Sequence, residues 1–304
     1  MRILVTGGAG FIGSHIVDAL LAGGHAVAVL DNLSTGRPEN VPAGVALYQD
    51  DIRSAACGAI LAREKPECII HQAAQVSVAK SLADPAGDAA INIAGTINLL
   101  EHARRAGVRK IVYASSAAVY GNPAELPLTE TAACRPLSPY GASKLAGEYY
   151  LAVYAANYGL SYTALRYANV YGPRQVRDGE GGVVTIFTGE LLAGRKLTVH
   201  GDGEQTRDFV YVEDVAAANV LALTRGDNAV YNIGTGSSIS LNRLAAELGE
   251  AAGQTAKIAF SAPQPGDIRH SRLAAARAAA DLGWQPRVSL AAGLRRTVRS
   301  FRED

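Results

Sequence analysis

The sequence is poor in charged residues and has no excess of either sign. Charged residues fill 19% of its 304 positions, and 29 basic residues are balanced by 28 acidic ones, for a formal net charge of +1. This balance argues against nucleic acid or an anionic membrane surface as the main partner. Apolar runs stop far short of the roughly 20 residues that a bilayer-spanning helix needs, so we expect no membrane protein.

Cysteine is scarce as well. The three cysteines, Cys57, Cys68 and Cys134, are an odd number without the spacing of metal ligands. The sequence therefore predicts free thiols, no bound metal and a cytoplasmic location. The first residues pass directly into a strand pattern, so we expect no secretory signal. Hydrophobic residues reach 48%, too many for intrinsic disorder, and the length suggests about two domains.

Short apolar runs alternate with helical patterns over the first half of the chain. Strands are expected at 2–6, 26–30, 45–48, 68–71, 111–114 and 162–167, and helices at 11–22, 55–63, 88–106 and 140–158. Continuous apolar strands between helices are typical of a parallel sheet covered on both faces. The predicted fold is α/β, a Rossmann-type doubly wound parallel sheet with a smaller C-terminal substrate-binding domain. The expected division is 1–171 and 172–304, with part of 207–236 returning to the first domain.

Three glycines follow the first predicted strand and open the first predicted helix. Gly7, Gly10 and Gly13 are spaced for a tight turn that brings the backbone close to a diphosphate at the positive helix end. Asp31 ends the second strand, where its carboxylate can accept ribose hydroxyls and would repel a 2′-phosphate, so NAD is favoured over NADP. Two alternatives stay open: Arg37 is near enough in sequence to soften the exclusion of NADP, and a glycine-rich turn can occur without a ligand.

A tyrosine and a lysine lie four residues apart at the start of the fourth predicted helix. Tyr140 and Lys144 therefore share one face, and Ser115 and Ser116 follow the fifth strand at the edge of the sheet where ligands bind. A tyrosine has an ordinary pKa of about 10, but a nearby ammonium and the positive nicotinamide both favour the phenolate. We predict that Tyr140 removes a substrate hydroxyl proton while hydride moves to NAD, and that Ser116 holds the same oxygen.

Seven motifs occur in order along almost the whole chain: TGGAGFIGSH, HQAAQVSV, SSAAVYG, YGASK, RYANVYGPRQ, GDGEQTRDFVYVEDVA and YNIGTG. On these motifs the sequence resembles the extended short-chain dehydrogenase/reductase family. Within that family it is most similar to the nucleotide-sugar 4-epimerases, which act on UDP-glucose and UDP-galactose. The glycine turn and the Tyr-Lys pair are typical of the superfamily, and the later motifs are typical of the nucleotide-sugar branch.

The resemblance implies a role for each matched position. Tyr140 looks like the catalytic base, Lys144 like its pKa-lowering and ribose-binding partner, and Ser116 like the hydroxyl that aids proton transfer. The positions that resemble NAD contacts are Gly7, Gly10, Phe11, Ile12, Gly13, Asp31, Asn32, Asp51, Ile52, Ala73, Ala74, Asn92, Ser115, Tyr140, Lys144 and Tyr167. Those that resemble contacts to the UDP-sugar substrate are Ser116, Tyr140, Asn169, Val183, Gln205, Arg207, Asp267 and Ser271. From spacing alone, a solvated Asp51 and a core Ile52 are equally good interpretations.

Further positions narrow the implied reaction. In related dehydratases and decarboxylases, acids follow the serine or threonine of this segment, and here those places hold Ala117 and Ala118. Hydride return without further chemistry is therefore expected, so that C4 of a UDP-hexose is inverted through a transient 4-keto sugar. Ser271 stands where some relatives have a large tyrosine, which suggests that N-acetylated hexoses also fit.

Several interpretations stay open beside this one. The chain could be another nucleotide-sugar epimerase or reductase, acting on a UDP-uronate or a different sugar, or a non-catalytic NAD-sensing scaffold. The outer stripes of helices 88–106 and 140–158 predict a homodimer seam, as in relatives, with burial inside the monomer as the alternative. Gln264 replaces a second basic residue of many relatives, so we expect Arg207 and Arg269 to anchor the diphosphate.

Overall fold

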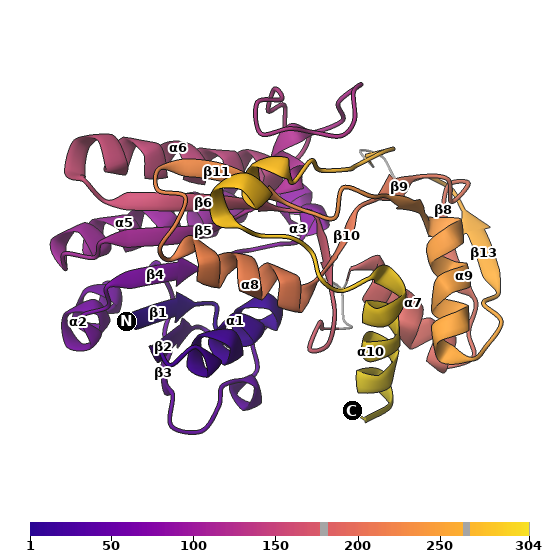
Figure 1. Ribbon diagram of the computed structural model, residues 1–304, viewed down its shortest axis with the longest axis horizontal. Helices are drawn as coiled ribbons and strands as arrows, with labels where there is room; N and C mark the ends of the chain where they lie inside the picture. The colour runs from indigo at the N-terminus through magenta and orange to yellow at the C-terminus, as the bar shows by residue number, and fades with distance from the viewer. Residues whose placement is uncertain (177–181, 264–267, 304) are drawn as a thin grey trace.

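Seven parallel strands form the central sheet of the protein (Figure 1). The structure is a computed structural model that describes residues 1–176, 182–263 and 268–303. The strands lie in the order β11-β6-β5-β4-β1-β2-β3. Their bounds are β1 (Arg2–Thr6), β2 (Ala26–Asp31), β3 (Ala46–Gln49), β4 (Cys68–His71), β5 (Lys110–Ser116), β6 (Ser161–Tyr167) and β11 (Ala229–Ile233). The order reverses between β1 and β4, and ligands bind at the carboxyl ends of strands beside such a point. The predicted doubly wound sheet is confirmed.

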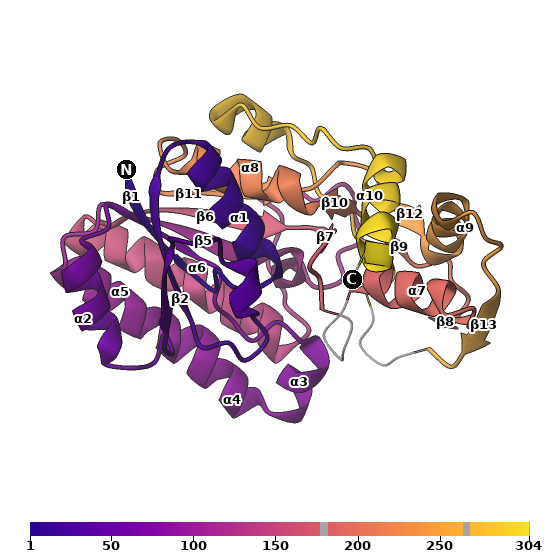
Figure 2. The same cartoon turned by 90° about the horizontal axis from the view of Figure 1, so that it is seen from below.

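Side chains of each strand alternate between two hydrophobic clusters, one on each face of the sheet. In β1, Ile3 and Val5 join the cluster that holds side chains of α1 (Phe11–Ala22) and α8 (Val212–Ala222). Leu4 joins the opposite cluster, with α2 (Ala56–Glu64), α5 (Thr96–Arg105) and α6 (Pro139–Tyr158). Figure 2 shows these two layers of helices on either side of the sheet. Because both faces are covered, most positions inside the strands are apolar and the sequence shows continuous apolar runs.

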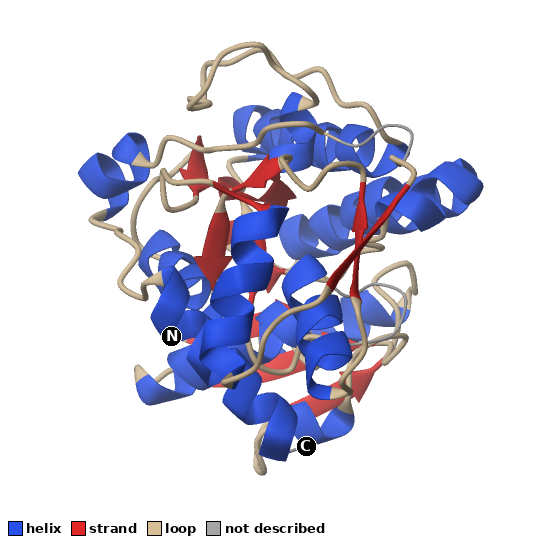
Figure 3. Ribbon diagram, turned by 90° about the vertical axis from the view of Figure 1, so that its right-hand side faces the viewer, coloured by secondary structure: helices blue, strands red, loops and turns tan. Residues whose placement is uncertain are grey.

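The C-terminal part packs helices beside short strand pairs and has its own hydrophobic cluster (Figure 3). The cluster joins α7 (Val183–Leu192), α9 (Leu241–Ala252) and α10 (Leu290–Glu303). The strand pairs are β8 (Leu197–His200) with β13 (Ile258–Ser261), β7 (Asn169–Tyr171) with β10 (Phe209–Tyr211), and β9 (Thr206–Arg207) with β12 (Ile239–Ser240).

The chain returns to the large sheet twice after β10. In the first return, α8 packs on α1 and β11 extends the sheet beside β6. The second return is not in the sequence analysis: Leu273, Leu282 and Trp284 are buried in the same cluster as α1, and the segment includes the π-helical turn η4 (Ala278–Leu282). The division of the chain at 171 and 172 stays a prediction.

The helix predicted over 88–106 is interrupted. It is replaced by α4 (Pro85–Ala89), a π-helical turn η2 (Ala90–Gly95) and α5. Turns of this kind are rare and often lie at functional sites. The other described elements are α3 (Val78–Ala83) and two short 3-10 turns, η1 (Pro38–Asn40) and η3 (Ala117–Tyr120). Among the helices of the described ranges, none is both long enough and apolar enough to cross a bilayer.

Candidate active site

The glycine turn between β1 and α1 leaves no space for larger residues. Gly7 has a φ of +70°, which favours glycine, and a Cβ there would lie 2.6 Å from the backbone nitrogen of Ala73. A Cβ on Gly13 would lie 2.0 Å from the carbonyl oxygen of Gly7. Gly10 precedes α1 directly, so the positive end of a 12-residue helix faces a turn whose one side chain is the buried methyl group of Ala9. This arrangement suits a diphosphate.

Helix α6 begins just before Tyr140 because its first residues cap it. The Ser138 hydroxyl accepts a hydrogen bond from the Gly141 backbone nitrogen at 3.1 Å, and Pro139 opens the helix with its φ already set. A Cβ on Gly141 would lie 2.6 Å from the carbonyl oxygen of Ala118. The absence of that side chain lets the start of α6 approach the turn after β5, which places Tyr140 beside Ser116.

Tyr140, Lys144 and Ser116 come together at the carboxyl edge of the sheet. Lys144 is 3% exposed, and its Nζ donates to the carbonyl oxygen of Ala114 at 2.9 Å and lies 6.0 Å from the centre of the Tyr140 ring. Ser116 ends β5 and is hydrogen-bonded to the Tyr140 side chain. A phenol, an ammonium and a hydroxyl therefore converge where the sequence predicted them.

Burial disfavours the charged form of both members of the pair. It raises the pKa of the Tyr140 phenol, which a hydrogen bond with Ser116 opposes and the carboxylate of Asp88 reinforces. It also lowers the pKa of Lys144 to about 8, against the negative charge of Asp88. The sequence predicts that Lys144 lowers the pKa of Tyr140, but in the protein without cofactor burial has the larger effect and raises this pKa. Formation of the phenolate therefore requires further positive charge at the site.

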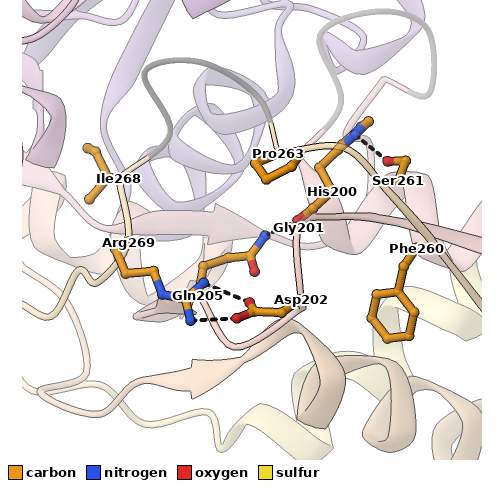
Figure 4. Close-up of a pocket in the computed structure, with 9 residues that line it drawn as sticks. All are labelled: His200, Gly201, Asp202, Gln205, Phe260, Ser261, Pro263, Ile268 and Arg269. Carbon is orange, nitrogen blue, oxygen red and sulfur yellow. Dashed lines mark hydrogen bonds and ion pairs between the residues drawn. The ribbon is translucent and has the colours of Figure 1, made fainter.

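A cavity of about 720 Å³ lies beside the β8–β13 pair (Figure 4). Gln205 is 6% exposed and donates from Nε2 to the carbonyl oxygen of His200 at 2.7 Å, while within the described ranges its Oε1 has no hydrogen-bond partner. The guanidinium of Arg269 meets the carboxylate of Asp202 at 2.7 and 2.9 Å, and Phe260 adds an apolar wall. An apolar pocket with a few directed polar groups suits an organic ligand.

The segment after Gln205 leads from this cavity to the edge of the large sheet. Arg207 lies in β9, and Asp208 follows with no exposed surface. The carbonyl oxygen of Asp208 accepts from the backbone nitrogen of Asn169 at 2.9 Å, two residues after β6 ends. Ser271, which is 8% exposed, donates its backbone N–H to the residue before Arg207. Four predicted substrate positions therefore follow one path.

For two other predicted substrate positions, the structure gives no contact with this segment. Val183 is half-buried and is the first residue of α7. Asp267 lies outside the described residues, as does Gln264. Their predicted roles stay predictions.

Known proteins resemble this chain over its whole length. Residues 3–234 match the model of the NAD dependent epimerase/dehydratase family. A UDP-glucose 4-epimerase from Mycolicibacterium smegmatis is 48% identical over 309 residues, 99% of each chain. The crystal structure of a UDP-glucose 4-epimerase with UDP-glucose from Thermotoga maritima has a TM-score of 0.98 and 47% identity, over 100% of this chain and 99% of that one. That of a Thermus thermophilus UDP-glucose 4-epimerase in complex with NAD has a TM-score of 0.95 and 47% identity, over 99% of each chain.

The chain belongs to the NAD-dependent epimerase/dehydratase family. The resemblance drawn from the seven motifs is confirmed, and so are the fold class and the choice of NAD as cofactor.

The rim of the glycine turn fits the NAD of this family. Asp31 is 7% exposed, and its Oδ2 accepts from the backbone nitrogen of Ala9 at 2.9 Å. A carboxylate has further lone pairs with which it can accept ribose hydroxyls. Beside it, Asn32 donates to Asp51 at 2.9 Å, and Arg53 holds the pKa of Asp51 well below its usual range. The turn, the helix end and the acidic rim together form a cradle for a dinucleotide without a 2′-phosphate.

Other predicted NAD positions lie at the same edge of the sheet. Phe11 and Ile12 open α1, and Ala74 follows β4. Ile52 is 4% exposed in the core, in contact range of Gly95, so the core interpretation of this residue holds for its side chain. Contact of these four residues with NAD stays a prediction.

Three predicted NAD contacts use their polar groups inside the protein. The hydroxyl of Ser115 donates to Glu148, and that of Tyr167 accepts from the amide of Asn219 at 2.8 Å. Asn92 is 1% exposed, with its amide group fully hydrogen-bonded to neighbouring residues. These polar groups connect helices and strands of the protein to one another. At these three positions NAD would therefore contact backbone atoms or the face of the tyrosine ring.

A buried polar cluster beside the catalytic pair is absent from the sequence analysis. Asp88 is 2% exposed and accepts from the side chains of Gln75 and Asn92 at 2.8 and 3.1 Å. The available signal was an acid one helical turn before Asn92. That signal is weak, because helical spacing does not distinguish a buried acid from a solvated one.

Proposed function

We propose that this protein is a UDP-glucose 4-epimerase that interconverts UDP-glucose and UDP-galactose by inverting C4 of the sugar. The observation that carries the proposal is the convergence of Tyr140, Lys144 and Ser116 at the sheet edge that also carries the glycine turn. Full-length likeness to UDP-glucose 4-epimerases supports the same reaction.

Each of the three side chains has a distinct task in this reaction. Tyr140 takes the proton of the sugar 4-hydroxyl and later returns it, while Ser116 donates a hydrogen bond to the same sugar oxygen. Lys144 keeps a positive charge beside the phenol, which favours its ionised form. Bound NAD supplies the hydride acceptor, and its positive nicotinamide adds to the charge of Lys144. The 4-keto sugar receives the hydride back on its other face.

The turn after Ser116 supports epimerisation over dehydration. Ala117 and Ala118 fill the two positions after that serine, in the 3-10 turn that approaches α6. Neither side chain carries an acid, so within this turn nothing can protonate a leaving hydroxyl.

The nucleotide is proposed to lie in the cavity beside β8 and β13. The unpartnered amide oxygen of Gln205 can accept a hydrogen bond from a base, and the guanidiniums of Arg207 and Arg269 can bind diphosphate oxygens. The path over Asn169 to the sheet edge then brings the sugar to Tyr140. We propose contacts for Val183 and Ser271 along the same path.

The test of the function mixes the purified protein with UDP-galactose and no added NAD. UDP-glucose should form, because NAD that stays bound is restored in each turnover and is not consumed. A panel that includes a UDP-uronate and other nucleotide sugars identifies the substrate by product stereochemistry. Binding of NAD without conversion of any nucleotide sugar would favour a non-catalytic scaffold.

Ser271 favours a second substrate class, the N-acetylated UDP-hexoses. A small, buried side chain at this position leaves room that a large side chain would fill. A single contact in a pocket changes the ratio of turnover between two substrates by about 10–200-fold. Turnover of UDP-N-acetylglucosamine below about a thousandth of that of UDP-glucose would therefore contradict this second substrate class.

Two further properties belong to the proposal. We infer that the enzyme works as a homodimer through the outer face of α6. We also infer a cytoplasmic location, which is supported by the free thiols of Cys57, Cys68 and Cys134.

A further inference from the structure

A buried carboxylate lies beside the catalytic pair and has no part in the proposed reaction. Asp88, in α4, is 2% exposed. Its Oδ1 accepts two hydrogen bonds, from Gln75 Nε2 at 2.8 Å and from Asn92 Nδ2 at 3.1 Å. Its Oδ2 has no hydrogen-bond partner in the described part of the chain. A buried, half-satisfied carboxylate is costly unless a positive charge compensates it.

The ammonium of Lys144 is a positive charge within electrostatic range of this carboxylate. Asp88 acts by its charge on both Lys144 and Tyr140, raising the pKa of each. The other titratable groups that face Lys144 cannot supply the negative charge that Asp88 supplies. The ring of Tyr113 on β5 lies 5.1 Å from Nζ, and burial raises the pKa of that phenol further from neutrality. His71 on β4 is kept neutral, since burial and then Lys144 lower its pKa to about 3.

The groups on neighbouring turns are also accounted for. Glu148, one turn after Lys144 on α6, is paired with Arg166 at 2.7 Å. Tyr167 on β6 has a pKa that burial raises to about 12, so it is neutral at working pH. Among the described residues that act by their charge on the pair, Asp88 is therefore the carboxylate that forms no ion pair within 4 Å.

Asp88 is also joined to α6 by hydrogen bonds. The amide of Asn92, which donates to Asp88, lies 3.1 Å from the hydroxyl of Ser143. That hydroxyl donates to the backbone carbonyl oxygen of Tyr140 at 3.0 Å. The π-helical turn at 90–95 carries Asn92, so the irregular turn, Asp88 and the first turns of α6 form one connected unit.

We propose that Asp88 is a positioning residue of the catalytic pair: its carboxylate is the counter-charge that keeps buried Lys144 cationic, and through Asn92 and Ser143 it fixes the turn of α6 that carries Tyr140. In this arrangement Lys144 and Asp88 cancel each other at rest. A phenolate at Tyr140 then forms beside a lysine that is still charged. The kinetic consequence rests on the proposed function, and the ionisation of the pair does not.

The test is the Asp88→Asn variant of the full-length protein supplied with NAD. Asparagine keeps an oxygen for both amide donors and removes the charge. The alkaline fall of kcat/KM for UDP-galactose should move to lower pH by about 0.5–1 unit, because Lys144 loses its proton more easily. The tyrosinate absorbance assigned to Tyr140, taken as the difference from the Tyr140→Phe variant, should also appear at lower pH, while the thermal midpoint changes little.

Asp214→Asn is the matched control. Asp214 is a carboxylate 4% exposed in α8 that accepts from the backbone nitrogens of Arg287 and Val288, and it has no part in the site. Its variant should leave both titrations in place. Unmoved titrations in Asp88→Asn would overturn the proposal, even where its thermal midpoint falls. If Asp88→Asn does not fold, the uncharged Asp88→Ser is measured with the same expectation. A protein without epimerase activity still gives the tyrosinate titration, so the two proposals fail separately.

Discussion

The phenol of Tyr140 lies where burial and a hydrogen bond act on its ionisation in opposite directions. Burial raises its pKa, and the hydrogen bond with Ser116 opposes the rise. Tyr140→Phe removes the proton acceptor and keeps the ring, so we expect turnover to fall by a factor of about 10²–10⁴. Conversion of UDP-galactose checks this, with circular dichroism to show an intact fold. Full activity would remove Tyr140 from its role as base.

The pKa of Lys144 determines the pH dependence that we expect for the reaction. Burial lowers its pKa to about 8, so the ammonium is present below that pH and is lost above it. If the charge is needed, kcat/KM should fall as the pH rises through about 8. Lys144→Met should be slow at every pH and should lack this fall. An alkaline fall that persists in Lys144→Met would assign it to another group.

The sequence predicts the convergence of Tyr140 and Lys144 better than the contacts of the residues around them. A four-residue spacing places these two side chains on one helix face without any other information. Ser115 and Asn92 are predicted as cofactor contacts, and their polar groups also bond to Glu148 and to the cluster around Asp88. Glu148 lies 33 residues from Ser115, and Gln75 and Ser143 lie 17 and 51 residues from Asn92, so local spacing carries no information about these partners.

At the scale of elements, the glycine turn is the feature most sensitive to a single methyl group. In Gly13→Ala the new Cβ would lie 2.0 Å from the carbonyl oxygen of Gly7, so the turn must open. We expect a loss of about 1–3 kcal/mol in the free energy of unfolding and weaker binding of NAD. Thermal denaturation and calorimetric titration with NAD measure the two effects.

Gly10→Ala is the control for this prediction. Its Cβ would lie 3.2 Å from the same oxygen of Gly7, a contact that a small shift can relieve. Gly10→Ala should therefore lose less stability and less NAD affinity than Gly13→Ala. Equal NAD affinity for Gly13→Ala and the unmodified protein would show that the turn does not hold the diphosphate.

Helices and strands are predicted well where the hydrophobic periodicity of the sequence determines them, and poorly where contacts with distant residues determine them. The first six strands of the large sheet and the helices α1, α2 and α6 lie within a few residues of the predicted ranges because both faces of the sheet are apolar. Strand β11 of the same sheet was not predicted. The π-helical turn in the predicted helix 88–106 was not expected. Asn92 bonds there to Gln75 and Ser143, which are distant in sequence, and the stripe of apolar residues continues past the turn. The helices α7 and α8 were also not predicted, because the alternation weakens in the second half of the chain.

At the scale of the whole molecule, the proposed reaction divides between two regions. Tyr140 and Lys144 lie at the edge of the large sheet, and the cavity proposed for the nucleotide lies in the C-terminal part. Asp208 connects them: it is buried, its carboxylate accepts from Thr235 and Gly236 after β11, and its carbonyl accepts from Asn169 after β6. From the sequence, Arg207, the residue before Asp208, is predicted to bind the substrate, and Asp208 has no predicted role. The hydrogen bonds show that Asp208 joins the two regions.

The outer face of α6 is the basis for the last prediction, which concerns assembly. Tyr149 and Val153 are 64% and 50% exposed on this helix, so burial inside the monomer is wrong for these two side chains. An exposed apolar helix face is stabilised when a second copy covers it. We expect sedimentation analysis to give twice the mass of one chain, and Tyr149→Glu or Val153→Glu to give the single mass, because a buried unpaired charge is costly. Ile186→Glu, at a position 47% exposed on α7, should leave the assembly unchanged. A single mass for the unmodified protein at every concentration, or dissociation by Ile186→Glu alone, would place the interface elsewhere or remove it.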